Sequence, residues 1–265
     1  MNTLELKMVD ILKDLKDNYY VSGIKAEFEA ECTRFDEVVR LKEIAAHTGL
    51  DLTIKVGGCE AVKDIYDAKA LGATSIVAPM IESPYAAKKY LNALKMIFSE
   101  EERKSMRFLI NIETKYGFQY AEDILASDIA QDLSGIVFGR TDMAGSLGML
   151  TNEINNVIIL DFAQKLAAIT KKYNKELVIG GGVSALSLPF FKQLPEDTFT
   201  HFETRKVIFD AQKTLHNSNA KNGIKKAIDF EILWIKNKQN YYGSISSADS
   251  KRIEVLESRT NLIEA

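Results

Sequence analysis

Between about residue 20 and residue 205, short apolar or β-branched runs alternate with stretches of helical period. This alternation is typical of successive βα units. Helical stripes recur at i, i+3, i+4 and i+7 spacing, at Ala87, Tyr90, Leu91 and Leu94 and again through Ile158, Phe162, Leu166 and Ile169. The pattern predicts seven strands, at residues 23–30, 52–57, 75–79, 107–113, 135–139, 176–182 and 198–203. Helices between them are expected to cover the outside of a parallel sheet.

A closed barrel of this kind needs eight strands, and the first helical stretch, LELKMVDILKDLK, has no strand before it. Either the chain has lost its first strand, or a further element begins at Tyr20 or at residues 207–210. An open doubly wound sheet also fits the alternation, but its GxGxxG signature is absent. The predicted fold is therefore α/β, a TIM (βα)8-type barrel of parallel strands over residues 1–215. Residues 216–265 are predicted to form a C-terminal helical extension that packs on the barrel or on a neighbouring subunit.

Charged residues alternate with apolar ones along three of the predicted strands. Because strand side chains alternate between faces, the charged set points into the lumen if the apolar set meets the helices. The inward residues are predicted to be Lys25, Glu27 and Glu29 on the first strand, Thr53 and Lys55 on the second, and Asn111 and Glu113 on the fourth. Buried unpaired charges cost several kcal/mol, so this set must form ion pairs, bind a metal or meet a charged ligand. A set of structural ion pairs is the alternative to a catalytic site.

Composition and charge narrow the class of protein. The chain has 265 residues, 46% of them hydrophobic and 27% charged, with a formal net charge of -3. This balance argues against disorder and against nucleic acid as the main partner. No apolar run is long enough for a membrane span, and the charged start of the chain does not resemble a signal peptide, so a cytoplasmic protein is expected. The two cysteines, Cys32 and Cys59, have neither CxxC nor zinc-site spacing and are expected to be reduced.

Three segments carry a family resemblance: SIVAPMIESPYAAKKYL (75–91), FLINIETKYGFQYAEDI (108–124) and LSGIVFGRTDMAGSLG (133–148). In order and spacing they resemble HpcH/HpaI aldolases and the related citrate-lyase β-type enzymes. The resemblance covers roughly residues 20 to 205. It implies that Glu113 and Asp142 bind a divalent metal ion, and that the backbone N–H groups of residues 139–142, including Gly139 and Thr141, meet a pyruvate-like carboxylate.

The implied carboxylate pair suits Mg²⁺ or Mn²⁺, which prefer oxygen ligands and act as Lewis acids on a 2-oxoacid. The reaction implied is that of a metal-dependent class II aldolase or lyase, which forms or cleaves a carbon–carbon bond through a pyruvate-like enolate, with an aldehyde as second substrate. An acyl-CoA ester lyase of the citryl or malyl type is the nearest rival. A phosphoenolpyruvate mutase or isocitrate-lyase-like activity is more distant, and a non-catalytic barrel that binds metal and oxoacid belongs to another class.

The chain departs from the family pattern at two places. Lys55 stands where the family usually has Arg, and Ala30 stands where a GEH-like motif would place His, although Glu29 matches the acid of that motif. Lys55 is predicted to act as a catalytic cation, while a Schiff base on Lys55 or Lys25 is the alternative chemistry. The candidates for the general base are then Glu29, Glu31, a metal-bound water and His201.

Two further segments are candidates for substrate binding. Arg140 precedes Asp142 by two residues and is predicted to meet an anionic substrate group. The GGGVS segment (180–184) ends a predicted strand, so Gly181, Gly182 and Ser184 are predicted to bind an anion, although a tight structural turn explains the glycines equally well. With FETR (202–205), this predicts an acidic or phosphorylated substrate. The family also implies a homo-oligomer, for which Ile228, Leu233 and Trp234 are candidate contacts.

Overall fold

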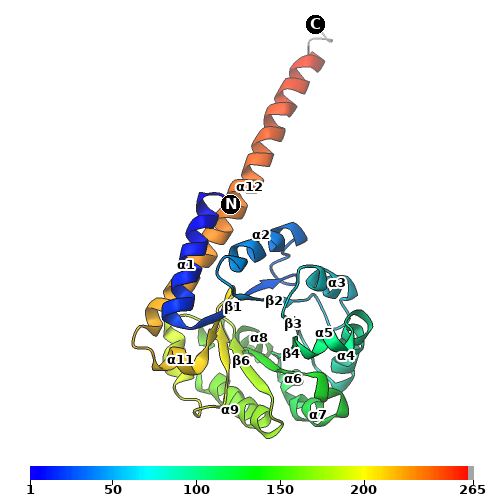
Figure 1. Cartoon of the computed structure of the whole chain (residues 1–265), viewed down its shortest axis with the longest axis vertical. Helices are drawn as coiled ribbons and strands as arrows, with labels where there is room; N and C mark the ends of the chain where they lie inside the picture. Colours follow the sequence, from blue (N-terminus) through cyan, green and yellow to red (C-terminus); the bar gives the residue numbers. More distant parts are fainter. Residues whose placement is uncertain (262–265) are drawn as a thin grey trace.

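The structure, a computed structural model, describes residues 1–261 and contains one closed barrel of eight strands (Figure 1). The strands follow one another around the barrel in chain order: β1 (Val21–Glu27), β2 (Asp51–Lys55), β3 (Ser75–Ala78), β4 (Arg107–Ile112), β5 (Gly135–Gly139), β6 (Glu176–Gly180), β7 (His201–Glu203) and β8 (Val207–Asp210). The predicted barrel is confirmed.

The eighth strand corrects the expectation that all strands are parallel. Strands β1 to β7 pair in parallel, but β8 runs antiparallel to both β7 and β1. The physical reason is the connection: only residues 204–206 join β7 to β8, too few for the helical crossover that a parallel pair requires. Residues 207–210 were one of the open candidates for the missing strand, and they close the barrel. The short turn also places Thr204 to Lys206 at the mouth where the parallel strands end.

Helices surround the barrel as predicted. They are α1 (Thr3–Tyr19), α2 (Phe35–Ala46), α3 (Val62–Ala70), α4 (Pro84–Ile97), α5 (Glu100–Lys104), α6 (Lys115–Gln119), α7 (Ala121–Ala126), α8 (Arg140–Ser146), α9 (Val157–Lys172), α10 (Leu188–Phe191), α11 (Ala211–His216) and α12 (Ala220–Asn261), with 3-10 turns η1 (Asp128–Asp132), η2 (Thr151–Glu153) and η3 (Ala185–Ser187). Local sequence signals explain several boundaries. The Asn2 side chain accepts hydrogen bonds at the start of α1, and Ser83 caps α4, which begins with Pro84.

The core has two parts that follow from strand alternation. Outward residues such as Ile24, Ile54 and Ile110 are completely buried beneath the helices. Inside the barrel, Val77, Leu109, Val137 and Val178 form a separate apolar cluster. This plug closes the lumen below the strand ends, so the charged inward residues gather above it, at the mouth.

The C-terminal extension is one helix. Figure 1 shows α12 lying alongside α1 and then projecting away from the barrel. Its first half is anchored by Ile224, Phe230 and Trp234, which are buried. Ile228 and Leu233, predicted as possible subunit contacts, instead pack against the core of their own chain. Within residues 1–261 no helix combines the length and apolar character that a membrane span needs.

Candidate active site

The carboxyl ends of the parallel strands surround a cavity of about 200 Å³. Its lining includes every residue that strand alternation placed inward from the first, second and fourth strands except Thr53. The charged members are Lys25, Glu27, Glu29, Lys55, Glu113, Asp142, Glu203 and Arg205. The prediction that these strands direct ionisable groups into one interior is therefore confirmed, and Val137 of the apolar plug forms part of the same lining.

One side of the cavity is an ion-pair cluster around Lys25. Its Nζ lies 3.1 Å from Oε1 of Glu27 and also forms a short ion pair with Glu203. Burial alone would lower the pKa of Lys25, but Glu203 and Glu27 raise it above its ordinary value. Burial would likewise raise the pKa of Glu27, whereas Lys25, Lys55 and Arg205 lower it. Lys25 is therefore a charged ammonium at neutral pH, which removes the reason to regard it as a Schiff-base nucleophile.

The other side is built around Glu113, which is 2% exposed. Its Oε1 accepts a hydrogen bond of 3.0 Å from the backbone N–H of Met80, and its Oε2 accepts one of 2.6 Å from the amide of Asn111. Lys55 Nζ lies 3.7 Å from Glu113 Oε1 and 2.7 Å from Glu29 Oε2. Lys55 thus stands between two carboxylates, with Glu113 held in one orientation by two donors and Glu29 nearer the solvent.

A glycine makes room for Glu113. A Cβ at Gly139 would lie 2.6 Å from Glu113 Oε2 and 2.8 Å from Glu113 Cβ, closer than real Cβ atoms approach. Gly139 ends β5, and α8 begins at the next residue, so Asp142 lies in the first turn of that helix and is exposed. Gly180 serves a similar purpose opposite, because its Cβ would lie 3.0 Å from Glu203 Oε1. The close approach of Glu113 requires glycine at the end of β5, whereas a Cβ at Gly180 would require Glu203 to shift by a few tenths of an ångström.

The residues at the mouth fit a divalent cation. Five carboxylates and three cationic side chains line the cavity, an excess of two negative charges. The amide oxygen of Asn111 is buried and, within residues 1–261, accepts no hydrogen bond, so it is free to face a ligand or an ordered water. No group of three or more His, Cys, Asp and Glu side chains in the described part of the chain is arranged to bind a metal. The resemblance implies that a cation would rest on Glu113 and Asp142 with water completing its shell, which Mg²⁺ tolerates.

Arg140 does not reach this cavity. Its side chain is completely buried and donates hydrogen bonds to the carbonyls of Gly180 (3.0 Å) and Gly181 (2.8 Å) and to Asn155 Oδ1 (2.7 Å). Burial lowers its pKa to about 9. The expectation that Arg140 meets an anionic substrate group is therefore wrong. The first turn of α8 directs the Arg140 side chain beneath the glycine turn that follows β6, where the guanidinium binds the carbonyls of that turn and holds it against α8.

The other residues predicted for the site also fall into two groups, those that line the cavity and those that lie outside it. Thr141, Gly181 and Gly182 line the cavity, and both of these glycines have positive φ angles, +82° and +58°. Ser184 lies outside the lining and caps η3 by accepting from Leu186 N. His201 begins β7, so it lies at the end of that strand remote from the mouth, and burial lowers its pKa. The remoteness of His201 removes it as a general base, and the short ion pair of Glu31 with Lys206 ties up that carboxylate.

Three polar lining residues had no individual assignment from the sequence. Glu203, Thr204 and Arg205 come from the end of β7 and the turn that follows it. The sequence analysis connected the FETR segment as a whole with an acidic substrate. The pairing of Glu203 with Lys25 joins residues 178 positions apart, and a pattern of neighbouring residues does not predict such a contact. Arg205 Nη1 lies 3.9 Å from Glu27 Oε2 and is half exposed, which leaves it a cation at the rim.

The chain is similar in sequence to one family model and in fold to several solved structures. The family model described as HpcH/HpaI aldolase/citrate lyase matches residues 32–180. No individually curated protein matches the sequence. Among solved structures, an HpcH/Hpal aldolase/citrate lyase family protein from Burkholderia cenocepacia J2315 has a TM-score of 0.57 at 16% identity, covering 73% of this chain and 91% of that one. Macrophomate synthase has a TM-score of 0.58 at 13% identity, covering 90% of this chain and 82% of that chain.

A variant of the citrate synthase SbnG has a TM-score of 0.52 at 13% identity and is covered over 99% of its length, against 91% of this chain. At these identities the structural matches establish the fold. The family model matches more than half of the chain, and its family is one of aldolases and lyases.

Proposed function

Because the chain belongs to the HpcH/HpaI aldolase/citrate lyase family, we propose that it is a metal-dependent aldolase or lyase that forms or cleaves a carbon–carbon bond next to a pyruvate-like 2-oxoacid. The observation that carries the proposal is the mouth of the barrel, where Glu113 and Asp142 line one small cavity with Lys55 and an excess of two negative charges. Mg²⁺ or Mn²⁺ bound there would supply Lewis-acid stabilisation of the negative charge that develops on the oxoacid oxygen.

The chain's own residues have distinct roles in this proposal. Asn111 and the Met80 N–H hold Glu113 with 2.6 Å and 3.0 Å hydrogen bonds, so the carboxylate is oriented before substrate arrives. The Lys55 ammonium, which lies between Glu29 and Glu113, stabilises the substrate carboxylate or oxyanion. Glu29 is the proton acceptor and donor, since its carboxylate is the one at the rim that contacts Lys55 and stands where the family motif has its acid. Gly139, Thr141, Gly181 and Gly182 line the cavity and leave room for a flat oxoacid.

Size favours a small substrate. A cavity of about 200 Å³ is smaller than typical sites for drug-sized ligands, so a three- to five-carbon oxoacid fits better than a whole acyl-CoA ester. Arg205 at the rim favours an acidic group on the second substrate, an aldehyde.

The experiment is exchange of pyruvate methyl protons in D₂O, followed by NMR. We expect exchange with Mg²⁺ or Mn²⁺, loss of exchange in EDTA, and a decrease of about 100-fold or more in Glu113→Gln and Asp142→Asn. Glu122→Gln is the matched control, because that carboxylate is half exposed and pairs with Lys172 on the surface, outside the cavity.

Exchange that survives EDTA but not Lys55→Met would replace the proposal with Schiff-base chemistry. Absence of exchange from wild-type protein with either metal would reject pyruvate enolisation, and turnover of a citryl- or malyl-type thioester would then select the acyl-CoA alternative.

A further inference from the structure

Lys206 is a buried cation that the proposed reaction does not use. It lies in the turn of residues 204–206 between β7 and β8, and only 1% of its surface is exposed. Its Nζ forms a short ion pair with Glu31, in the loop of residues 28–34 that also carries Glu29 and is called the Glu29 loop below. No other carboxylate in the described part of the chain lies within ion-pair distance of it. A charge buried this deeply destabilises a fold unless an opposite charge neutralises it, so this contact is one that the fold must keep.

The Glu29 loop depends on this contact for its shape. The loop turns back on itself, because the N–H of Cys32 donates to the carbonyl of Glu29 at 3.1 Å. The turn places Cys32 at a positive φ of 48°, which costs free energy in a residue that has a side chain. The Thr33 hydroxyl donates to Glu31 Oε2 at 3.2 Å, and the same oxygen pairs with Lys206. The side chain of Glu31 therefore holds a strained turn closed beside Glu29.

The turn that carries Lys206 belongs to the wall of the barrel. The carbonyl of Lys206 accepts a hydrogen bond of 2.9 Å from the N–H of Lys25 on β1. The N–H of Thr204 donates to the carbonyl of Val207, at the start of β8, at 3.0 Å. Lys206 does not line the cavity at the mouth, so it does not contact substrate. The ion pair thus holds the Glu29 loop against a turn that the closed barrel fixes in place.

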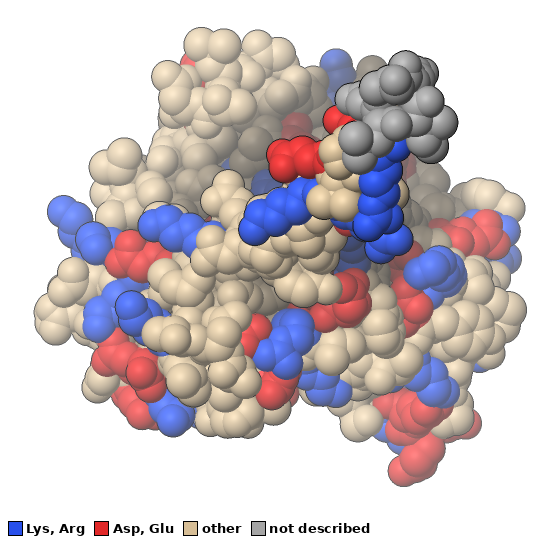
Figure 2. All heavy atoms as spheres, turned by 90° about the horizontal axis from the view of Figure 1, so that it is seen from above, with Lys and Arg blue, Asp and Glu red and all other residues tan. Residues whose placement is uncertain are grey.

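Helix α12 keeps this ion pair away from water. The Trp234 ring is 3% exposed, and its centroid lies 5.8 Å from Lys206 Nζ. Burial lowers the pKa of Lys206 from its ordinary value, and Glu31 opposes this shift. Figure 2, which looks down on the projecting end of α12, shows basic and acidic side chains interspersed over that face of the molecule. Exposed pairs between such side chains contribute little, whereas a shielded pair fixes the geometry of its two partners.

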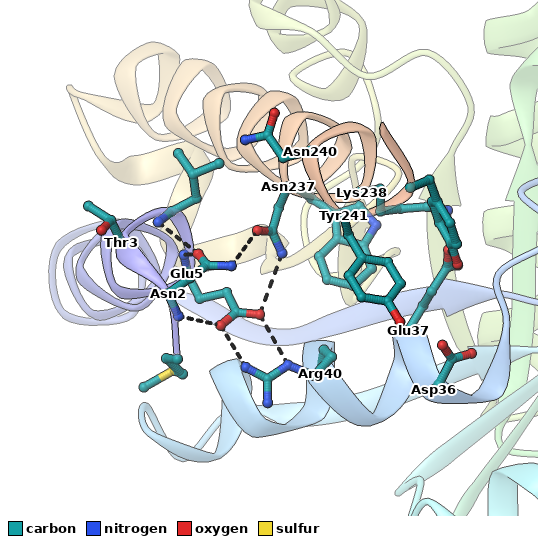
Figure 3. Close-up of a pocket in the computed structure, with 14 residues that line it drawn as sticks. Asn2, Thr3, Glu5, Asp36, Glu37, Arg40, Asn237, Lys238, Asn240 and Tyr241 are labelled. Carbon is teal, nitrogen blue, oxygen red and sulfur yellow. Dashed lines mark hydrogen bonds and ion pairs between the residues drawn. The ribbon is translucent and has the colours of Figure 1, made fainter. Parts of the chain in front are cut away.

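The same helix also holds the far end of the Glu29 loop. Helix α2 follows the loop directly, and Glu37 in its first turn accepts a hydrogen bond of 3.0 Å from the N–H of Arg34. Lys238 and Tyr242 of α12 both donate to the carboxylate of Glu37, at 3.0 Å and 2.7 Å (Figure 3). Trp234, Lys238 and Tyr242 are spaced by four residues and therefore share one face of α12. This face supports the Glu29 loop at both of its ends.

We infer that Lys206 is a positioning residue for the reaction at the mouth of the barrel: through Glu31 it sets the place of Glu29, with α12 as its support. The inference rests on the proposed function, in which Glu29 accepts and donates the proton. Glu29 Oε2 lies 2.7 Å from Lys55 Nζ, and Glu31 follows Glu29 by two residues. Without the Lys206 contact the loop can relax and carry the Glu29 carboxylate away from Lys55. A misplacement of about 1 Å lowers a reaction rate by roughly 100-fold.

The first test is metal-dependent exchange of pyruvate methyl protons in Lys206→Met and Glu31→Gln. Methionine removes the charge and keeps a long apolar stem, and glutamine keeps the shape of Glu31, so the two variants break the same ion pair from opposite sides. In each we expect kcat to fall by about 10- to 100-fold. The KM for pyruvate and the affinity for Mn²⁺ should change less than about threefold, because Glu113 and Asp142 are untouched.

Lys226→Met is the matched control. Lys226 also pairs with a carboxylate, that of Asp14 on α1, and its Nζ lies 5.4 Å from the centroid of the Tyr19 ring. The same substitution therefore removes an ion pair with the same kinds of neighbours, at a place that does not touch the Glu29 loop. We expect its kcat to stay within about twofold of the wild-type value.

The second test, amide hydrogen exchange followed by mass spectrometry, needs no substrate. The N–H groups of Phe28, Cys32 and Thr33 each donate to a backbone carbonyl. We expect them to exchange about 10-fold faster or more in Lys206→Met and Glu31→Gln, with unchanged exchange in β4 and β5. Such a local change separates a loss of loop position from a general loss of stability.

Three results would each overturn the inference: equal loss of kcat in Lys226→Met, unaltered amide exchange in the Glu29 loop, or faster exchange spread evenly over the barrel. A fall in kcat with an equal loss of Mn²⁺ affinity would do the same, because it places the effect at the metal site. Failure of the proposed function is recognised separately. Wild-type protein that exchanges no pyruvate protons rejects that reaction, and amide exchange alone then decides whether Lys206 positions the loop.

Discussion

Replacing Gly139 with alanine tests whether the position of one carboxylate controls the site. The added Cβ would lie 2.6 Å from Glu113 Oε2, and an ordinary contact begins near 3.4 Å, so Glu113 must move by about 0.8 Å. Gly139 has φ -86° and ψ 95°, angles that alanine adopts without strain. Glu113 is 2% exposed and held by two hydrogen bonds, so it cannot move without losing them. The substitution therefore acts through displacement of Glu113.

The expected cost has two parts. Overpacking of this kind destabilises a protein by about 1–3 kcal/mol, measurable by urea unfolding. A misplacement of about 1 Å in a catalytic group lowers rate by roughly 100-fold, measurable as metal-dependent deuterium exchange into pyruvate. Gly145→Ala is the control, because it lies in the same helix, α8, and its Cβ meets nothing within 4 Å. Wild-type exchange and Mn²⁺ affinity in Gly139→Ala would refute the assignment of Glu113 as a ligand that needs this room.

Three further predictions concern the structure around the site. The pKa of Glu27 is lowered from 4.5 in the folded state, so its carboxylate stabilises the fold above that pH, and this stabilisation is lost as the pH falls through the pKa of the folded state. Glu27→Gln should therefore make the free energy of unfolding in urea depend less on pH below about pH 4.5. The same pH dependence in the variant and the wild type would contradict this. Arg140→Met removes the side-chain donor from one buried and one partly buried carbonyl and should lower the free energy of unfolding in urea by about 2–5 kcal/mol. A loss below about 1 kcal/mol would contradict a structural role for Arg140. Gly181→Ala should lower the melting temperature more than Gly148→Ala. Both glycines have a positive φ, but only at Gly181 would a Cβ contact the backbone, 2.6 Å from Thr141 N. Equal decreases in calorimetry would show that the backbone strain of the positive φ alone determines the cost.

The alternation of polar and apolar residues along the strands correctly predicted which side chains of β1, β2 and β4 point into the barrel. Alternation along β1, β2 and β4 placed Lys25, Lys55 and Glu113 inside because the helices demand an apolar outer face, and the cavity contains all three. The family resemblance supplied Glu113 and Asp142 as a pair. Their role as metal ligands stays a prediction, while the cavity brings the two side chains to one place.

The sequence was less informative where direction depends on a turn. Arg140 follows Gly139 at the start of α8, where no alternation applies, and only the packed structure reveals that it points beneath the β6 glycines rather than into the cavity. The reversal of β8 is of the same kind. A run such as Val207 to Asp210 reads as a strand in either direction, and the shortness of its link to β7 becomes decisive only once the end of β7 is known.

The chain by itself determined the βα order and the inward set of charges, because periodicity of side chains along strands and helices is a local property, whereas the antiparallel β8 that closes the barrel came from the tertiary structure. Tertiary structure decided which charges meet. Lys25 pairs with Glu203, which is 178 residues away in the sequence, and Lys55 lies between Glu29 and Glu113. The absence of a side chain at Gly139 leaves room for Glu113. Such pairings depend on distances through space that closure of the barrel sets, and no spacing along the sequence encodes them.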